Sequence, residues 1–448
     1  MAGRGPGAAR RLLGWLAPGF GFKRHVAVLA LGALVGALGL SELLRRSHAP
    51  LLHALSGGVA AASDVEALAL LVLGAVLTIY AIARITRAVV DAAISPGAGR
   101  LFRLYPEAAL ASRGPRVVAL GGGTGLSVLL RGVKRYTWNI TAVVAVSDDG
   151  GSSGRLRSEL GMPPPGDIRN CLVALADTEP LMERLFQHRM AAGSGLKDHA
   201  FGNLFLAAMT EITGGDFERA IRESSRVLAV RGRVLPSTLT PVSLRAELLD
   251  GRWLEGESAI GNAGAPIRRV HLVPERPAPL AEVLAAVAEA DLIVLGPGSL
   301  YTSIVPHLLV AGMSEALRGS GALKVYVANI MTQPGETDGM DALAHVRALL
   351  EHGAPIDVAV VNTGRLPPLA LERYRREGSE PVAATSEQLR ALGLRVVEAS
   401  LWDGGEGVLR HDADGLGRIL VSLLLERRLH LERGRRAVAP VGGAGAVR

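Results

Sequence analysis

The stretch RVVALGGGTGLSVLLRGVKRYTWNITAVVAVSDDGGSSGRLR, residues 116–157, holds an apolar run, a glycine loop, a helical pattern and a second apolar run that ends in paired acids. Residues 117–120 predict a buried strand, and residues 126–134 have helical apolar spacing. A strand, a glycine turn and a helix in this order favour anion binding, because free N–H groups and the positive end of the helix dipole attract negative charge. The stretch therefore predicts a nucleotide-phosphate site at the carboxyl edge of a sheet.

The remainder of the C-terminal part alternates strand-like runs with longer helical patterns. Further strands are predicted at residues 140–146, 292–295, 324–328, 358–361 and 395–399. This alternation predicts an α/β fold with a Rossmann-like, doubly wound and mostly parallel sheet. The less regular region 213–274 contains short segments at 242–248 and 269–273, which predict a small antiparallel β insertion that caps the sheet.

The N-terminal part contains two apolar runs, residues 25–44 and 65–83, each long enough to cross a bilayer as a helix. Basic residues before the first run and after the second outnumber those between them, so the positive-inside rule predicts a two-helix transmembrane hairpin with both ends in the cytoplasm. A signal peptide followed by a core helix is the alternative. We therefore expect a multi-pass protein of the inner (cytoplasmic) membrane, with both termini and the main domain in the cytoplasm.

The predicted organisation has five parts: a cytoplasmic segment 1–24, the hairpin 25–85, a linker 86–112, a nucleotide-binding domain 113–428 and a disordered tail 429–448. The net charge is +7, but aromatic residues make up only 4% of the chain and the basic residues are scattered, which argues against nucleic-acid binding. The single cysteine, Cys171, excludes an intramolecular disulfide and a cysteine-based zinc site, and we expect it to be buried in a helix.

The first glycine loop alone does not define its ligand. In the dinucleotide register Gly121 and Gly123 fit, but Leu126 occupies the third glycine position, and the loop lacks the lysine of a P-loop. A tight turn without a ligand is one alternative. A nicotinamide enzyme is another, since Asp148 and Asp149 follow at about the distance expected of a ribose-binding acid.

The acids after the second strand predict a cation. Adjacent carboxylates repel each other unless a cation or donors compensate them, and we expect Asp149, rather than Asp148, to face the site. Asp167 follows three prolines and precedes an apolar helical stretch, so it is either an N-cap or, with Asp149, a ligand of Mg²⁺ that bridges phosphate oxygens.

Two further loops follow predicted strands and add glycine and polar residues at the same edge, at residues 296–303 and 329–339. Tyr301 either stacks on a base or packs a turn, and His199 is expected to be structural. Together the loops predict one shared ligand site. Its candidate residues are Gly122, Gly123, Thr124, Gly125, Asp148, Asp149, Ser152, Ser153, Arg155, Asp167, Arg169, Asn170, Asn203, Gly296, Gly298, Ser299, Tyr301, Asn329, Gln333 and Thr337.

Five motifs carry a resemblance to a known family: GGGTGLSVLLRG at 121–132, SDDGGSSGRLR at 147–157, PPPGDIRN at 163–170, GPGSLYTS at 296–303 and NIMTQPGETDG at 329–339. Over residues 113–428 the chain resembles the CofD-like family and, within it, the YvcK group of gluconeogenesis factors. The resemblance implies a Rossmann-like fold and a UDP-sugar ligand such as UDP-N-acetylglucosamine. It also implies a role in cell shape and cell-wall precursor supply on gluconeogenic carbon sources, with Tyr301 as a ligand contact.

The CofD enzymes themselves transfer a phospholactyl group from a guanosine diphosphate carrier to a deazaflavin, with acidic residues and Mg²⁺, and Asp149 and Asp167 look like the counterparts of those acids. The motifs around these acids are more similar to the YvcK group. We therefore expect a membrane-tethered UDP-sugar-binding regulator, a homo-oligomer whose partners are regulators of cell-wall synthesis, with no catalytic residue assigned. The alternative is a Mg²⁺-dependent 2-phospho-L-lactate transferase-like enzyme. The membrane hairpin departs from the usual members of the group.

Overall fold

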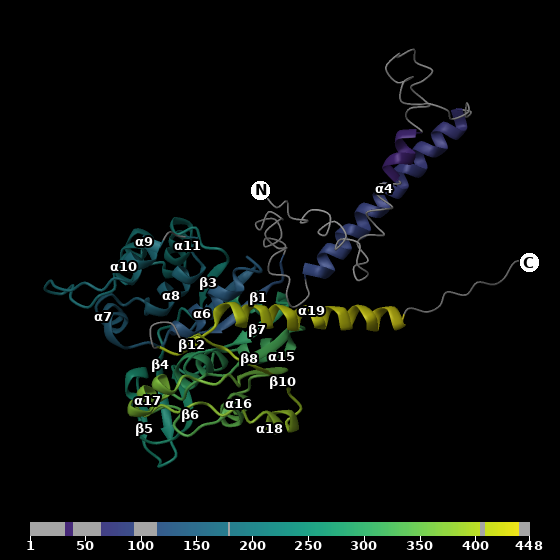
Figure 1. Ribbon diagram of the computed structural model, residues 1–448. Coiled ribbons are helices and arrows are strands. Elements are labelled where there is room, and N and C mark those ends of the chain that lie inside the picture. Colours follow the sequence, from purple (N-terminus) through teal and green to yellow (C-terminus); the bar gives the residue numbers. More distant parts are fainter. Residues whose placement is uncertain (1–31, 39–63, 94–113, 178–179, 404–407, 439–448) are drawn as a thin grey trace, which may run out of the picture. The chain divides into compact units, whose positions relative to one another are not determined.

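The computed structural model describes residues 32–38, 64–93, 114–177, 180–403 and 408–438, and within helix α4 it describes the side chains of residues 68–80 and 82–83 (Figure 1). The chain forms two units, Met1–Glu107 and Ala108–Arg448. The first contains α4 (Asp64–Ala93) and a short helix at residues 32–38, and the second contains the sheet and the candidate site.

In the N-terminal unit the short helix lies against α4. The backbone of Gly36 is so close to Gly74 that a side chain at Gly74 would collide with it. Of the first predicted membrane span only residues 32–38 are described, while the second lies within α4. Among the described residues, no helix combines the length and the apolar character that crossing a bilayer requires. This finding corrects the predicted membrane hairpin and the multi-pass location.

The second unit is built on a parallel sheet of seven strands in the order β10-β9-β8-β7-β1-β2-β3. The α/β, Rossmann-like prediction is confirmed, and six strands lie where the sequence predicts them. The seventh, β3, is missed because it is short, begins with an exposed arginine and ends in proline. The strands are β1 (Val117–Gly121), β2 (Ile140–Val144), β3 (Arg233–Pro236), β7 (Leu292–Leu295), β8 (Leu323–Val327), β9 (Val358–Asn362) and β10 (Arg395–Ala399).

Alternate residues of the central strands enter two separate cores, one on each face of the sheet. In β1, Val118 and Leu120 join one core, while Val117 and Ala119 join the other. The first core is completed by α13 (Ala281–Glu289), α14 (Val305–Leu308), α15 (Met313–Gly319), α16 (Ala342–Glu351) and α18 (Ser386–Ala391). The second is completed by α6 (Gly123–Val133), α7 (Gly151–Leu160), α8 (Gly166–Leu175), α9 (Pro180–Gln187), α10 (Phe201–Ile212), α11 (Phe217–Val227) and α19 (Ala413–Val438). Cys171 is buried in α8, as predicted.

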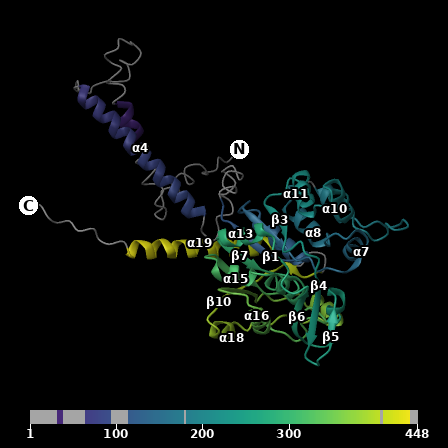
Figure 2. The ribbon, with the colours of Figure 1, turned by 180° about the vertical axis from the view of Figure 1, so that it is seen from behind.

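The small β insertion is also present. Strands β4 (Ser243–Leu248), β5 (Trp253–Glu255) and β6 (Ile267–Val273) pair antiparallel in the order β5-β4-β6, and α12 (Glu257–Ile260) follows β5. Figures 1 and 2 both show these strands on one side of the domain and α8, α10 and α11 on the other. The insertion belongs to the first core, where Leu244 and Val270 are fully buried.

The C-terminal helix α19 packs against α6, the helix that follows the first glycine loop. Glycine allows this close approach, since a side chain at Gly132 would collide with the Ala413 carbonyl group. A short hairpin, β11 (Trp402–Asp403) with β12 (Arg410–His411), precedes α19, and α17 (Pro368–Arg376) has no buried residue. Helix α19 continues to Val438, into the segment predicted to be disordered, and residues 439–448 lie outside the described part.

Candidate functional site

The two predicted glycine loops meet at the point where the order of the strands reverses. From β1 the chain adds β2 and β3 on one side, and from β7 it adds β8, β9 and β10 on the other. The crevice beyond the carboxyl ends of β1 and β7 is therefore the topological switch point, where open α/β sheets bind their ligands. Both loops lie there, one after each of these strands.

At the first loop, a carboxylate from another element occupies the helix N-terminus. Asp167, at the start of α8, accepts a hydrogen bond from the backbone N–H of Gly123, the first residue of α6. A side chain at Gly122 would lie 2.5 Å from Asp167 Oδ2 and 3.1 Å from Ser303 Oγ. Behind the loop, the buried His307 lies with Nε2 3.1 Å from the Gly121 carbonyl oxygen. The loop is thus packed from three sides.

The second loop repeats this arrangement. Glu336, from the loop after β8, accepts hydrogen bonds from Tyr301 N at 2.6 Å and Thr302 N at 3.3 Å, at the start of the π-helix η2 (Leu300–Ile304). Its Oε2 is buried without a partner among the described residues, and burial raises its pKa to about 7. Asn329 holds Gly298 with bonds of 3.2 and 2.8 Å. The sequence prediction selected the neighbouring Thr337 and missed Glu336.

The paired acids face in different directions. Asp149 Oδ1 accepts hydrogen bonds from Ser258 N at 2.9 Å and Ser258 Oγ at 2.7 Å, so it attaches α12 of the insertion to the loop after β2. Asp148 lies near the start of α8, where a side chain at Gly166 would be 3.5 Å from Asp148 Oδ2. Burial and then the charge of Asp148 raise the pKa of Asp167 to about 6. Asp149 also lines the larger hollow described below, so the expectation that Asp149 faces the ligand stays a prediction. Among the described residues, no group of three or more histidine, cysteine or acidic side chains is close enough to hold a metal ion.

Glu257, at the start of α12, is a further acid of the site that the sequence prediction missed. Burial raises its pKa to about 9, and the next contributions come from the negative charges of Asp148, Asp167 and Glu336. Glu257 thus lies within electrostatic range of three carboxylates from three other segments at this edge of the sheet. Such a grouping is costly for the free protein and is typical of a functional site.

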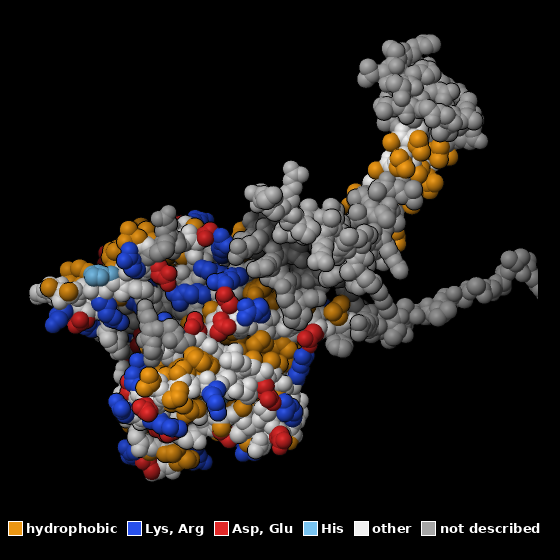
Figure 3. All heavy atoms as spheres, in the orientation of Figure 1, with side chains coloured by type: hydrophobic (Ala, Val, Ile, Leu, Met, Phe, Trp, Pro, Cys, Tyr) orange, Lys and Arg blue, Asp and Glu red, His pale blue; other side chains and the backbone are white. Residues whose placement is uncertain are grey.

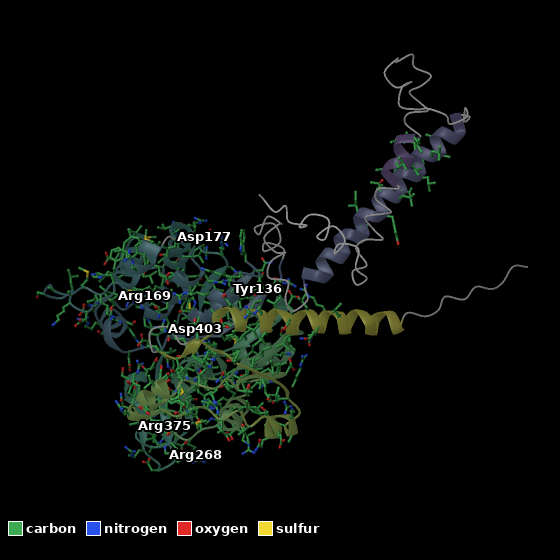
Figure 4. All side chains as sticks on the ribbon, in the orientation of Figure 1. Tyr136, Arg169, Asp177, Arg268, Arg375 and Asp403 are labelled. Atoms are coloured by element: carbon green, nitrogen blue, oxygen red, sulfur yellow. The ribbon has the colours of Figure 1, made fainter. Side chains whose placement is uncertain are left out.

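A chain of buried polar side chains joins α7, α8 and α10. Arg169 donates from Nη1 to Asn203 Oδ1 at 2.9 Å, and Asn203 Nδ2 donates to Ser152 Oγ at 3.0 Å. Ser152 Oγ also lies 3.0 Å from His199 Nδ1, which agrees with a structural histidine. Arg169 Nη2 donates to Asn170 Oδ1 at 2.9 Å. Figure 4 labels Arg169 among these helices. Burial and the nearby positive charge of Arg189 lower the pKa of Arg169 to about 10.

Tyr301 lies in the core and not in the crevice. It is 4% exposed, its ring makes an edge contact with His352 at 6.2 Å between ring centroids, and its hydroxyl lies 3.5 Å from the Ile267 carbonyl oxygen. Thr337 is likewise buried, and its hydroxyl accepts a hydrogen bond from Gln333 N at 2.8 Å. For Tyr301 the structure favours the packing role that the sequence left open.

Two hollows lie at this edge of the sheet. One, of about 370 Å³, is lined by six predicted residues, Thr124, Gly125, Gly298, Ser299, Asn329 and Gln333. It is also lined by Tyr374 and His411, which were missed because they lie beyond the predicted motifs. The other, of about 820 Å³, is lined by the predicted Asp149, Ser152 and Arg155 and by the missed Arg157 and Arg189.

The remaining predicted residues lie near these hollows. The contacts of Gly122, Gly123 and Asp167 place them at the first loop, and a side chain at Gly166 would lie between Ser153 and Asp148. Asn203 lies behind the larger hollow through its bond to Ser152, and Arg169 connects Asn203 to Asn170. Gly296 forms the turn after β7 with a φ of +76°. The structure thus brings most of the predicted residues to one edge and leaves Tyr301 and Thr337 in the interior.

Comparison with known proteins identifies the family. The sequence profile described as "2-phospho-L-lactate transferase CofD" matches residues 117–402. The "Gluconeogenesis factor" of Bacillus subtilis is 51% identical over 314 residues, which cover 70% of this chain and 99% of that protein. A crystal structure of a UPF0052-family protein from Bacillus halodurans is 49% identical, with a TM-score of 0.66, over 68% of this chain and 99% of that chain.

Other relatives match beyond this domain. A relative from Nostoc sp., whose name also contains the term gluconeogenesis factor, is 44% identical over 424 residues, or 91% of both chains. A match of that extent reaches into the N-terminal part, so this part is shared with such relatives and is not peculiar to this chain. The chain therefore belongs to the CofD family, with relatives named gluconeogenesis factors.

Proposed function

We propose that this chain binds a UDP-sugar such as UDP-N-acetylglucosamine and acts as a regulatory protein of the gluconeogenesis factor type, needed for cell shape and cell-wall precursor supply on gluconeogenic carbon sources. The observation that carries the proposal is the convergence of three strand-end loops at the switch point, with two hollows at the same edge of the sheet. Nucleotides bind at this position in open α/β sheets. The names of the relatives support the regulatory part.

The two hollows suit the two ends of such a ligand. The smaller hollow presents the amide groups of Asn329 and Gln333, which supply the donors and acceptors that a base and ribose require. The amide of Gln333 is already held by Ser299 Oγ at 2.5 Å, which orients it. The larger hollow, lined by arginines and serines, suits phosphate and sugar hydroxyl groups.

We also propose that Mg²⁺ accompanies the ligand. Asp148 and Asp167 are the carboxylates that we assign to it in place of Asp149, whose Oδ1 is bonded to Ser258. A divalent cation would offset the repulsion that raises the pKa of Asp167 and would neutralise charge on phosphate oxygens. With two acidic ligands, the remaining ligands would be water and phosphate oxygens, as is usual for Mg²⁺.

The test is a calorimetric titration of UDP-N-acetylglucosamine into the full chain with Mg²⁺, with GDP as the comparison ligand and recovery of the ligand afterwards. Selective binding of the UDP-sugar, recovered intact, is the expected result. Selective binding of GDP, or no binding of the UDP-sugar, would contradict the proposal.

The second candidate is a Mg²⁺-dependent 2-phospho-L-lactate transferase-like enzyme. The description of the family profile and the carboxylates Asp148, Asp167 and Glu257 favour it. Its test is turnover of a guanosine-diphosphate-linked phospholactate with a deazaflavin acceptor, measured on the same preparation. Formation of the phospholactyl product would favour the enzyme over the regulator.

We further propose that the protein assembles as a homo-oligomer and acts on regulators of cell-wall synthesis. Its mass in solution, measured by light scattering with and without the UDP-sugar, tests the first of these. Ligand-dependent recovery of a cell-wall synthesis protein with the full chain tests the second.

A further inference from the structure

Three arginines line the larger hollow and a fourth lies behind it, and none of the four has a carboxylate partner among the described residues. Among the described residues, Arg155, Arg157, Arg169 and Arg189 form no ion pair. Other arginines do, as in Arg131 with Glu183, Arg231 with Asp177 and Arg395 with Glu426, each at 2.6 Å. In Figure 3 blue and red side chains are interspersed over the visible face of the domain.

These arginines are held by neutral acceptors. Arg155 Nη2 donates to the Lys197 carbonyl oxygen at 2.8 Å, Arg189 Nη1 to the Asp198 carbonyl oxygen at 2.9 Å, and Arg157 Nη2 to the Val242 carbonyl oxygen at 2.6 Å. Two carboxylates, Asp149 and Asp198, also line the hollow, but neither forms an ion pair with them among the described residues. The guanidinium groups are therefore positioned but not neutralised.

The positive charge of Arg169 is buried, which lowers the stability of the protein without a ligand. Its side chain is 7% exposed, its Nε is buried without a partner among the described residues, and its guanidinium contacts only the amides of Asn203 and Asn170. Burial of this cation is destabilising, Arg189 adds a second positive charge nearby, and the charges of Asp167 and Asp148 offset these two effects only in part. The bond from Asn203 to Ser152 connects Arg169 to the wall of the hollow.

Within the described part of the chain, no side chain caps the helix N-terminus at this hollow. Helix α7 begins at Gly151 without a side-chain cap, and Gly151 and Ser152 line the hollow. By contrast, Asp167 and Glu336 fill the helix starts at the two glycine loops. The unneutralised positive charge of the site is therefore at the arginines.

We infer that the hollow bounded by Arg155, Arg157 and Arg189 is the phosphate subsite of this protein, and that it takes a diphosphate or phosphate ester with Arg169 as the buried charge behind it. The inference rests on the proposed function for the ligand class and on the arginines for the position. Arginine binds phosphate oxygens through paired N–H groups, and phosphate would supply the missing counter-charge. The phosphate belongs either to the nucleotide-sugar itself or to a separate phosphorylated metabolite.

The test is a titration of inorganic pyrophosphate into the full chain, comparing Arg189→Gln and Arg155→Gln with the control Arg268→Gln. Arg268 is exposed and paired with Glu247 at 3.1 Å, and Figure 4 labels it at the other end of the domain from Arg169. We expect each hollow variant to bind pyrophosphate about tenfold more weakly or worse, and the control to bind it as the wild type does. Saturable binding that is unchanged in the hollow variants, or no binding by the wild type, would overturn the inference.

A second measurement separates binding from folding. Without ligand, Arg189→Gln should melt at the same temperature as the wild type or higher, because it removes a like charge near Arg169. A clear drop in that melting temperature, with pyrophosphate affinity unchanged, would make Arg189 a structural residue and defeat the inference.

Competition distinguishes the two sources of the phosphate. If UDP-N-acetylglucosamine displaces pyrophosphate and Arg189→Gln weakens both, the subsite holds the diphosphate of the nucleotide-sugar. If both bind together, it holds a separate phosphorylated compound. Failure of the UDP-sugar to bind, with pyrophosphate binding still sensitive to Arg189, would defeat the proposed function and leave the subsite standing. If the UDP-sugar binds, and neither its affinity nor that of pyrophosphate changes in Arg189→Gln, the proposed function stands and the inferred subsite is wrong.

Discussion

The two glycine loops and the arginine hollow each have features that favour an anion. They differ in whether carboxylates of the protein itself already occupy the hydrogen-bond donors. At the loops, Asp167 and Glu336 already accept the helix N–H groups that a phosphate would use. At the hollow, Arg155, Arg157 and Arg189 donate hydrogen bonds only to neutral acceptors among the described residues. A glycine turn before a helix therefore indicates an anion site only where no side chain of the protein itself fills it.

The largest expected effect concerns the packing of the first loop. Gly122→Ala places a methyl group 2.5 Å from Asp167 Oδ2 and 3.1 Å from Ser303 Oγ, and should destabilise the chain by roughly 2–3 kcal/mol. Gly319→Ala, in open space at the end of α15, is the control and should be nearly neutral. Urea unfolding followed by circular dichroism measures both. Equal stability of the two variants would show that the carboxylate does not occupy the loop.

The next effect concerns the carboxylate at the second loop. Burial raises the folded-state pKa of Glu336 to about 7, above its unfolded value. The folded protein therefore binds more protons here than the unfolded chain does, and it loses stability as pH rises through about 7. Glu336→Gln keeps an oxygen for Tyr301 N and removes the charge. It should stabilise the chain by roughly 1–3 kcal/mol at pH 8 and hardly at all at pH 4. Thermal unfolding across this range measures the gain, and a gain that is independent of pH would contradict the titration of Glu336.

A smaller effect separates the paired acids. Asp149→Asn weakens the contacts with Ser258 and should cost about 1 kcal/mol of stability, with little change in the Mg²⁺ dependence of nucleotide binding. Asp148→Asn should instead reduce that Mg²⁺ dependence, because the charge of Asp148 raises the pKa of Asp167. Paired titrations with Mg²⁺ and with EDTA compare them. A Mg²⁺-specific loss in Asp149→Asn alone would instead support the prediction made from the sequence.

The smallest effect is expected at Tyr301. Tyr301→Phe removes a hydroxyl whose one hydrogen bond among the described residues is a long one of 3.5 Å, and keeps the ring in the core. Stability should change by less than about 1 kcal/mol and nucleotide affinity should not change. A calorimetric titration of the nucleotide into the variant and the wild type measures the affinity. A tenfold loss of affinity in the variant would place the tyrosine hydroxyl at the ligand.

The fold could be predicted because buried parallel strands are short apolar runs, and six of the seven were recognised in this way. The directions in which side chains point could not be predicted from the sequence. Asp148 and Asp149 are adjacent at a strand end, and only the position of Ser258, more than a hundred residues later, determines that Asp149 faces the insertion. Glu257 and Glu336 were missed because the sequence does not show that an acid is buried. Arg189 lies after α9, and its bridge to Ala200 and its bond to the Asp198 carbonyl oxygen hold it at the hollow.

The place of β1 in the sheet also has a consequence for the synthesis of the protein. Strand β1 pairs with β2 on one side and β7 on the other, and Leu292 of β7 follows its partner Val117 by 175 positions. At ribosomal rates of 5–20 residues per second, β7 is synthesised roughly 10–35 seconds after β1. During that interval the first glycine loop exists without the second loop, and the edge of β1 is open to incorrect pairing. The ligand site can therefore form only after most of the chain has left the ribosome.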